Sequence, residues 1–352
     1  MTRNLRSRCT LVACALGLAM ALAALLADAP IALAAATVER LGGTTRYQTM
    51  EKIVNAGFTR SEWAVVATAD NFPDALASSA LAGARDCPVL LTSGRSLSGE
   101  TLAEIGRLGV RNVYLMGGEA AVSASVESSL RSHGVGVVRV AGADRVATSA
   151  NALKEVRAAG STSDTVIVAT GARFADTLSI GPWAYRSHSP VILAKSDGTL
   201  SSDAVSAVKA DPYVKRIVLV GGTAAVSDAV RSQLGAYDYV RLDGQDRYQT
   251  SAEVARWVTS TGGMSWRRPA VATGENFPDA LAGAALVGSQ SSTILLVPSH
   301  LGGHGSASPV DYAYAVLADA ASRVETLYVL GGTAAIDADV CEIVATAVGS
   351  SS

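Results

Sequence analysis

Between residues 37 and 350, short runs of apolar and mostly β-branched residues alternate with segments in which apolar residues recur at helical spacing. The runs are apolar throughout, which is typical of parallel strands that are buried on both faces. In the first part of this region the pattern predicts strands at 63–68, 88–93, 112–118 and 137–140 and helices at 73–84, 101–108 and 123–131. The predicted fold class is therefore α/β, with parallel sheets covered by helices.

Four motifs recur in the same order three times along the chain. The first copy reads RLGGTTRYQT, NFPDALA, CPVLL and YLMGGEAAVS. The second reads RVAGADRVAT, RFADTLS, SPVIL and VLVGGTAAVS, and the third reads RLDGQDRYQT, NFPDALA, STILLV and YVLGGTAAID. The period of about a hundred residues is too long for a solenoid and indicates one small domain per copy. We expect three tandem Rossmann-like subdomains at 37–138, 139–238 and 239–352.

Two of the motifs directly follow predicted strands and open predicted helices. In the NFPDALA motif and its counterparts, the aspartates Asp74, Asp176 and Asp279 fall in the first helical turn, where they complement the positive helix end. In the GG motif, the two glycines suit a tight turn. Because open α/β sheets bind ligands at the carboxyl ends of their strands, we expect these loops to form a ligand-binding edge.

The N-terminal segment 1–36 has the features of a secretory signal peptide, namely three arginines, an apolar run and a series of small residues. Its removal takes three of the 29 basic and one of the 31 acidic residues, which leaves 26 and 30. A weakly acidic chain without a basic face disfavours nucleic acid and membrane surfaces as partners, and we expect no stable membrane span. The two remaining cysteines, Cys87 and Cys341, lie in apolar surroundings and are expected to be free thiols.

Motifs for catalysis or cofactor binding are absent from the sequence: it has no Walker loop and no G-x-G-x-x-G, G-x-S-x-G or H-E-x-x-H segment. His300 and His304 are separated by glycines, which favours a loop over a metal-binding helix face. Asp337 and Asp339 are interpreted as helix-start residues. The repeated aspartates could act as bases, but no His or Lys partner accompanies them. We expect no catalytic residue, no metal site and no cofactor.

The repeated arginines Arg46, Arg145 and Arg247 begin the helix that opens each copy. A positive charge at this position opposes the helix dipole, so its recurrence indicates another use. Each arginine could pair with the repeated aspartate of a neighbouring copy and hold the subdomains together. Alternatively, its guanidinium could face a phosphate or carboxylate ligand. The residues alone leave both uses open, with the structural pairing slightly favoured.

In combination, the four motifs resemble the type 2 cell-wall-binding repeat family of Gram-positive surface proteins over residues 38–348. The resemblance implies three Toprim-like subdomains in a pseudo-threefold arrangement and non-covalent attachment to an anionic secondary wall polymer, teichoic-acid-like or similar. It also implies that the three repeated arginines and the apolar strand motif contact this polymer. The residues of that strand motif are Val89, Leu90, Leu91, Val191, Ile192, Leu193, Ile294, Leu295 and Leu296.

The second and third copies depart from the family pattern. Val146 replaces the motif tyrosine, Arg173 and Ala175 replace Asn and Pro, and Thr293 replaces a further Pro. Pockets that involve the second copy are therefore expected to differ in strength or selectivity. The leading expectation is a secreted, non-catalytic cell-wall-binding protein. The alternatives are an accessory of a peptidoglycan hydrolase or amidase, and a surface-layer or adhesion component with a surface protein partner.

Overall fold

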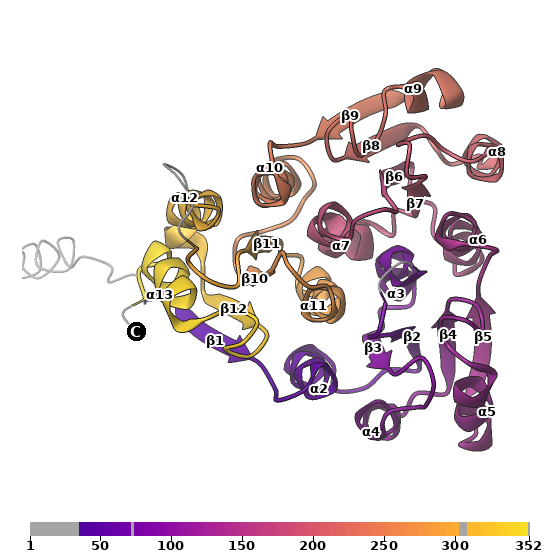
Figure 1. The fold of residues 1–352 in the computed structure, drawn as a ribbon, viewed down its shortest axis with the longest axis horizontal. Helices are drawn as coiled ribbons and strands as arrows, with labels where there is room; N and C mark the ends of the chain where they lie inside the picture. Colours follow the sequence, from indigo (N-terminus) through magenta and orange to yellow (C-terminus); the bar gives the residue numbers. More distant parts are fainter. Residues whose placement is uncertain (1–34, 72–73, 303–307, 351–352) are drawn as a thin grey trace, which may run out of the picture. The chain divides into compact units, whose positions relative to one another are not determined.

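Three separate four-stranded sheets organise the part of the chain that the structure describes. The structure is a computed structural model, and it describes residues 35–71, 74–302 and 308–350. Every strand pairing is parallel. The sheets surround a central group of helices, and Figure 1 shows one sheet for each copy of the repeated motifs. The expected fold class, three parallel α/β subdomains, is confirmed.

Each sheet takes its last strand from the motif that opens a different repeat. The sheet of repeat 1 has the order β3 (Val89–Thr92), β2 (Trp63–Thr68), β4 (Asn112–Met116) and β5 (Gly136–Val140). The sheet of repeat 2 has the order β7 (Val191–Ala194), β6 (Thr165–Thr170), β8 (Arg216–Val220) and β9 (Asp238–Leu242). The sheet of repeat 3 has the order β11 (Ile294–Val297), β10 (Ala270–Thr273), β12 (Thr326–Leu330) and β1 (Thr37–Leu41). Strands β5 and β9 thus complete the sheet of the preceding repeat.

Strand β1 completes the sheet of repeat 3, although it lies at the other end of the described chain. Its residues pair with β12 from Thr37 opposite Thr326 to Leu41 opposite Leu330. In Figure 1 the indigo strand β1 lies beside the yellow strand β12. The first repeat therefore begins inside the third sheet, and the three repeats form a closed cycle.

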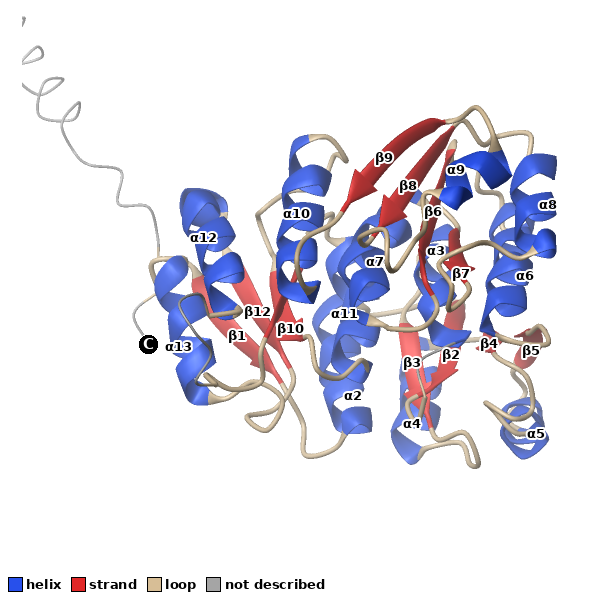
Figure 2. Ribbon diagram, turned by 45° about the horizontal axis from the view of Figure 1, so that its top comes forward, coloured by secondary structure: helices blue, strands red, loops and turns tan. Residues whose placement is uncertain are grey.

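Helices lie on the faces of the sheets, as Figure 2 shows. In repeat 1 they are α2 (Arg46–Gly57), η1 (Asp74–Ala77), α3 (Ser78–Ala84), α4 (Gly99–Leu108) and α5 (Ala124–Ser132). In repeat 2 they are α6 (Arg145–Ala158), α7 (Ala175–Ser187), α8 (Ser202–Ala210) and α9 (Ala229–Leu234). In repeat 3 they are α10 (Arg247–Ser260), α11 (Pro278–Ser289), α12 (Val310–Ala320), η2 (Ala321–Arg323) and α13 (Ala338–Ala347). The predicted helix at 73–84 consists of η1 and α3, and residue 73 lies outside the described residues.

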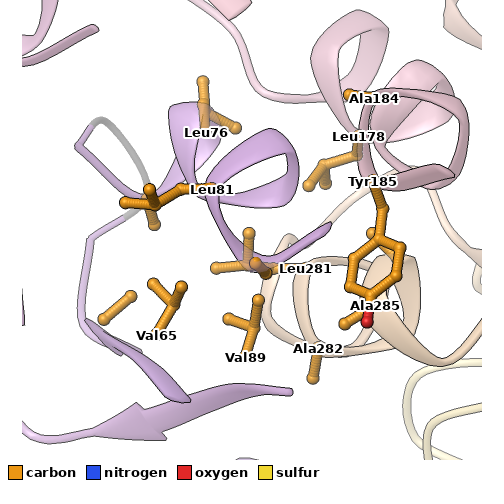
Figure 3. Packing of buried hydrophobic residues seen from close by; sticks show 14 of the residues in the cluster. Val65, Leu76, Leu81, Val89, Leu178, Ala184, Tyr185, Leu281, Ala282 and Ala285 are labelled. Carbon is orange, nitrogen blue, oxygen red and sulfur yellow. The ribbon is translucent and has the colours of Figure 1, made fainter. Parts of the chain in front are cut away.

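Helices α3, α7 and α11 contact one another pairwise and join the three repeats. The leucine of each NFPDALA-type motif belongs to the same buried cluster; these residues are Leu76, Leu178 and Leu281 (Figure 3). Small residues allow the close approach: a Cβ added to Gly181 would lie 3.0 Å from Ala284 Cβ and 3.1 Å from Ser79 Oγ. The alanine-rich sequence of these helices is therefore explained by their packing.

Candidate functional site

The repeated arginines are the first residues of α2, α6 and α10. Each reaches the end of the strand that follows its helix, which is β2, β6 or β10. The acceptor is the backbone carbonyl of the residue that follows the strand. The pairs are Arg46 with Ala69, Arg145 with Gly171 at 2.6 Å, and Arg247 with Gly274, in each case through Nη1. These bonds hold each guanidinium at the carboxyl edge of a sheet, where ligands are bound in open α/β folds.

The repeated aspartates lie in the first turn of η1, α7 and α11, as predicted, and each packs against the first glycine of the GG turn of its own repeat. The pairs are Asp74 with Gly117, Asp176 with Gly221 and Asp279 with Gly331. A Cβ built on Gly221 would lie 2.7 Å from Asp176 Oδ2, and the φ angle of this glycine is +105°. Only glycine meets both requirements without strain, so the two motifs fit together as one unit.

A second set of arginines attaches the opening strand of each repeat to the GG turn of the preceding one. Arg139 donates from Nη1 to the carbonyls of Gly117 and Val122, both at 2.8 Å. Arg40 and Arg241 make the equivalent bonds in the other two sheets. These arginines were not among the residues predicted from the sequence, although each stands at the start of a repeated motif. Their recurrence in RLGGTTR, RVAGADR and RLDGQDR was a sufficient signal.

The motifs of two different repeats meet in a cleft. Where repeat 3 meets repeat 1, the cleft has a volume of about 490 Å³. Its lining residues come from the opening loop of repeat 1 and from the NFPDALA, STILLV and GG loops of repeat 3. They are Gly43, Thr44, Thr45, Arg46, Thr49, Thr273, Glu275, Asn276, Pro278, Asp279, Ser299, Gly332, Ala334 and Ala335. The candidate site is thus shared between repeats, with Arg46 on one wall and Asp279 on the other.

Two of the repeated aspartates, Asp279 and Asp176, lie close enough to the arginine of the next repeat for its charge to affect their pKa values. Burial raises the pKa of Asp279 to about 6, and the positive charge of Arg46 acts in the opposite direction. Burial also raises the pKa of Asp176 to about 6, and Arg173 and Arg247 oppose that shift. In the described part of the chain no ion pair joins Arg46 to Asp279 or Arg247 to Asp176. Arg46 and Asp279 therefore line the same cleft without forming an ion pair with each other.

The residues of the apolar strand motif belong to the core. All nine are at most 2 % exposed, and they lie in β3, β7 and β11. In repeat 3, Ile294 and Leu296 pack into the central core, whereas Leu295 packs into the cluster on the outer face of the sheet. These side chains have no surface with which to contact a polymer, and we assign them to packing. They are Val89, Leu90, Leu91, Val191, Ile192, Leu193, Ile294, Leu295 and Leu296.

Strands β7 and β11 are outermost in their sheets, but a helix lies against the outer edge of each. The amide of Leu193 donates to Ser149 Oγ on α6 at 3.0 Å, and the amide of Leu296 donates to Ser251 Oγ on α10 at 2.9 Å. These hydroxyls occupy backbone donors that an exposed edge would otherwise offer to another strand. These two backbone donors are therefore not available for pairing with another chain.

Those remaining candidates that the structure describes do not line the cleft. Asp337 caps α13 by accepting from the Val340 amide at 2.8 Å, as a helix-start residue should, and His300 Nδ1 lies 3.3 Å from Asp337 Oδ2. Among the described residues there is no group of three or more histidine, cysteine or acidic residues that could hold a metal. Cys87 is a buried and Cys341 a half-buried free thiol. His304, Phe72, Pro73 and residues 1–34 of the expected signal peptide lie outside the described residues.

A larger cavity, of about 720 Å³, lies at the carboxyl ends of the three central helices and contains none of the repeated motif loops. Its charged residues have both signs and include Arg85, Asp86 and Arg186. Asp86 accepts a hydrogen bond from the Tyr185 hydroxyl at 3.0 Å, which ties the ends of α3 and α7 together. We regard this cavity as a junction between subdomains. No helix in the described part of the chain is long and apolar enough to cross a bilayer.

This arrangement defines a class of α/β repeat protein in which three units exchange their outer strands and the loops of two units meet in a cleft. Residues 40–127, 139–231 and 241–341 match the family described as cell wall binding domain 2 (CWB2), and the chain belongs to that family.

Similar proteins of known sequence and structure agree with this assignment. The chain is 30% identical over 279 residues to the N-acetylmuramoyl-L-alanine amidase LytC of Bacillus subtilis, across 79% of the chain and 54% of that protein. It is 28% identical over 263 residues to the amidase enhancer of Bacillus subtilis, across 74% of the chain and 35% of that protein. The chain thus spans about half or less of the length of these relatives.

Two solved structures from Clostridium difficile share the fold. Cwp8 superposes with a TM-score of 0.76 and 27% identity over 90% of the chain and 52% of Cwp8. Cwp6 superposes with a TM-score of 0.80 and 24% identity over 90% of the chain and 48% of Cwp6. The arrangement of three parallel α/β units is therefore a property that the chain shares with other proteins.

Proposed function

We propose that the chain is a secreted, non-catalytic protein that attaches non-covalently to an anionic secondary polymer of the cell wall. The observation that carries this proposal is the threefold placement of a guanidinium at the carboxyl edge of a sheet, anchored by a backbone carbonyl. A guanidinium binds phosphate and carboxylate groups through paired hydrogen bonds. Membership in a cell wall binding family supports a wall polymer as the source of such groups.

Three copies of the site suit a polymer whose anionic groups repeat. When several linked sites bind one chain, the second and third contacts become intramolecular, and apparent affinity rises by roughly 10²-fold or more where the geometry permits. The chain carries a formal charge of −2, so a general positive field is not available to attract the polymer. Binding must depend on focused groups such as Arg46, Arg145 and Arg247.

The test is co-sedimentation of the purified chain, without residues 1–36, with Gram-positive cell walls before and after removal of their anionic polymers. We expect binding to be lost with the polymers and to be weakened by Arg46→Gln, Arg145→Gln and Arg247→Gln. Circular dichroism and thermal unfolding of each variant would show that the fold survives. Binding that persists on stripped walls, or a folded chain that does not bind walls, would overturn the proposal.

A second candidate function is that of an accessory to a peptidoglycan amidase. The similarity to an amidase and to an amidase enhancer favours it, although each similarity covers only part of the relative. It predicts that the chain accelerates wall digestion by an amidase added separately, and that Asp74→Asn, Asp176→Asn or Asp279→Asn abolishes this effect. If wall digestion is unchanged while polymer binding is retained, the anchoring function stands alone.

A further inference from the structure

In the part of the chain that the structure describes, three residues other than glycine have a positive φ angle. They are Asp86 (φ +46°), His188 (φ +53°) and Ser291 (φ +54°). They occupy the same position in the three repeats, because each follows a central helix and stands three residues before the apolar strand motif. A left-handed backbone is unfavourable for any residue with a Cβ, and glycine is the usual residue at such helix ends.

At other helix ends the chain meets the same backbone requirement with glycine. Gly109 follows α4 with φ +72°, Gly134 follows α5 with φ +78°, and Gly160 follows α6 with φ +100°. Aspartate and histidine tolerate this backbone better than most residues, but they still lack the freedom of glycine. A side chain has thus been kept at all three central helix ends against the backbone preference, which indicates a use for these side chains.

All three side chains line one cavity, the cavity of about 720 Å³ at the carboxyl ends of the central helices. Its wall includes the last turns of these helices, through Ala84 of α3, Arg186 of α7 and Ser289 of α11. The carboxyl end of a helix carries a partial negative charge. Three such ends around one cavity favour a cationic group inside it.

The cavity holds a carboxylate that is fixed in place. Asp86 Oδ1 accepts from the Tyr185 hydroxyl at 3.0 Å, whereas Oδ2 accepts from no residue that the structure describes. Tyr185 itself lies tightly between α3 and α11: a Cβ on Gly83 would overlap its carbonyl group, and a Cβ on Gly288 would lie 2.7 Å from its own Cβ. Glu62 adds a second carboxylate to the same cavity. These acids and the helix ends together suit an ammonium group.

The two arginines of the cavity differ in their partners. The Arg85 guanidinium lies 4.5 Å from the centre of the Trp63 ring and donates to the Tyr114 hydroxyl from Nε at 3.3 Å and from Nη2 at 3.2 Å. Arg186 is exposed and makes no hydrogen bond or ion pair with any described residue. Arg186 therefore offers a guanidinium that can bind a carboxylate through paired hydrogen bonds.

We propose that this junction between subdomains is also a ligand site, separate from the cleft of the repeated motifs, and that it binds a short peptide in its zwitterionic form. Asp86 and the helix ends hold the ammonium group, and Arg186 holds the carboxylate. His188 and Ser291 supply an imidazole and a hydroxyl, which donate to or accept from the peptide groups between the two ends. The volume lies within the range of small-ligand sites, about 300–1,000 Å³.

Three probes that differ only at their ends test this inference. Trialanine carries both charges, N-acetyl-trialanine lacks the ammonium group, and trialanine amide lacks the carboxylate. Their affinities for the purified chain would be measured by saturation-transfer NMR. The variants are Asp86→Asn, which keeps a residue that tolerates positive φ, and Arg186→Gln. The matched control is Arg131→Gln, which alters an exposed arginine in the last turn of α5, outside the cavity.

We expect trialanine to bind roughly tenfold more tightly than either blocked probe, as expected for a charge-assisted hydrogen bond. Asp86→Asn should weaken binding of trialanine roughly tenfold and leave that of N-acetyl-trialanine nearly unchanged. Arg186→Gln should do the same for trialanine and leave trialanine amide nearly unchanged, and Arg131→Gln should alter none of the three affinities.

A further variant separates ligand binding from helix capping. His188→Gly should raise the temperature of thermal unfolding, because glycine relieves the strain at positive φ, yet it should weaken binding of trialanine. The inference fails if the folded, unaltered chain does not bind trialanine, or if all three probes bind with equal affinity. Either result leaves the attachment to a wall polymer untouched, because co-sedimentation with walls tests that function separately.

Discussion

Arg40 donates a hydrogen bond from Nη1 to the carbonyl of Gly331 at 3.1 Å, across 291 positions of the chain. Arg139 makes the same contact with Gly117 at 2.8 Å, across only 22 positions. The long contact and the short one are equivalent because β1 stands in the third sheet where β5 stands in the first. Strand β1 is therefore part of the subdomain of repeat 3, which is the last of the three in the sequence.

Removal of β1 should destabilise repeat 3, although β1 belongs to repeat 1 in the sequence. We expect a chain that begins at Gly42 to lose at least about 2 kcal/mol of unfolding free energy, since the two hydrogen bonds of Arg40 contribute roughly 1 kcal/mol each and the edge of β12 is exposed. Urea unfolding followed by circular dichroism would measure the loss. A chain that begins at Ala35 is the control, and equal stability of the two chains would refute the structural role of β1.

The two glycines of the GG turn should differ in their tolerance of substitution. Gly117 has φ +98°, and a Cβ on it would lie 2.9 Å from Asp74 Oδ2, whereas a Cβ on Gly118 would meet no atom within 4 Å. We expect Gly117→Ala to cost about 1–3 kcal/mol through strain at positive φ and Gly118→Ala to cost less than about 0.5 kcal/mol. Thermal unfolding of both variants tests this, and a similar loss from the two substitutions would contradict it.

The contrast between what the sequence predicted and what it missed follows from the range of the interactions involved. Strands such as Trp63–Thr68 are encoded locally, because burial on both faces requires a continuous apolar run. The pairing of β1 with β12 is a long-range contact that no local pattern announces. The sequence placed Arg46 and Asp279 in first helical turns and left open whether such an arginine pairs with the aspartate of a neighbouring copy. Only the fold shows that the two residues line one cleft from different repeats.

The apolar strand motif shows a different limit of what the sequence alone can predict. A run such as Val191–Leu193 beside a ligand-binding edge has the same composition whether it contacts a ligand or fills the core. Leu193 is fully buried, so Leu193→Ala should cost about 2–5 kcal/mol of unfolding free energy. At a temperature where the variant is still folded, its polymer affinity should equal that of the unaltered chain. A variant of normal stability that has lost affinity would restore the binding role to this residue.

The raised pKa of Asp279 predicts a dependence of stability on pH. The pKa of this carboxyl is about 6 in the folded chain and 3.8 where the carboxyl is exposed to water, as in the unfolded chain, so the folded state favours the protonated form. Its contribution is complete below pH 3.8 and is lost as the pH rises through 6. We expect Asp279→Asn, which imitates the protonated form, to be about 2 kcal/mol more stable than the unaltered chain at pH 7.5 and equal to it near pH 4. Urea unfolding across this range is the measurement, and a pH-independent difference would contradict the shift.

The same titration should regulate binding of an anionic polymer. Below pH 6 both Asp176 and Asp279 become neutral, while Arg247 and Arg46 keep their charge. A carboxylate about 4 Å from a bound anion costs roughly 1 kcal/mol in water-like surroundings, so affinity for teichoic acid should rise roughly fivefold per cleft between pH 7 and pH 5. The double variant Asp176→Asn with Asp279→Asn should bind at pH 7 as tightly as the unaltered chain binds at pH 5, because its clefts are already neutral at these positions. Calorimetry at both pH values decides the point: if the double variant keeps the full pH dependence, then these two carboxyls are not the groups that control binding.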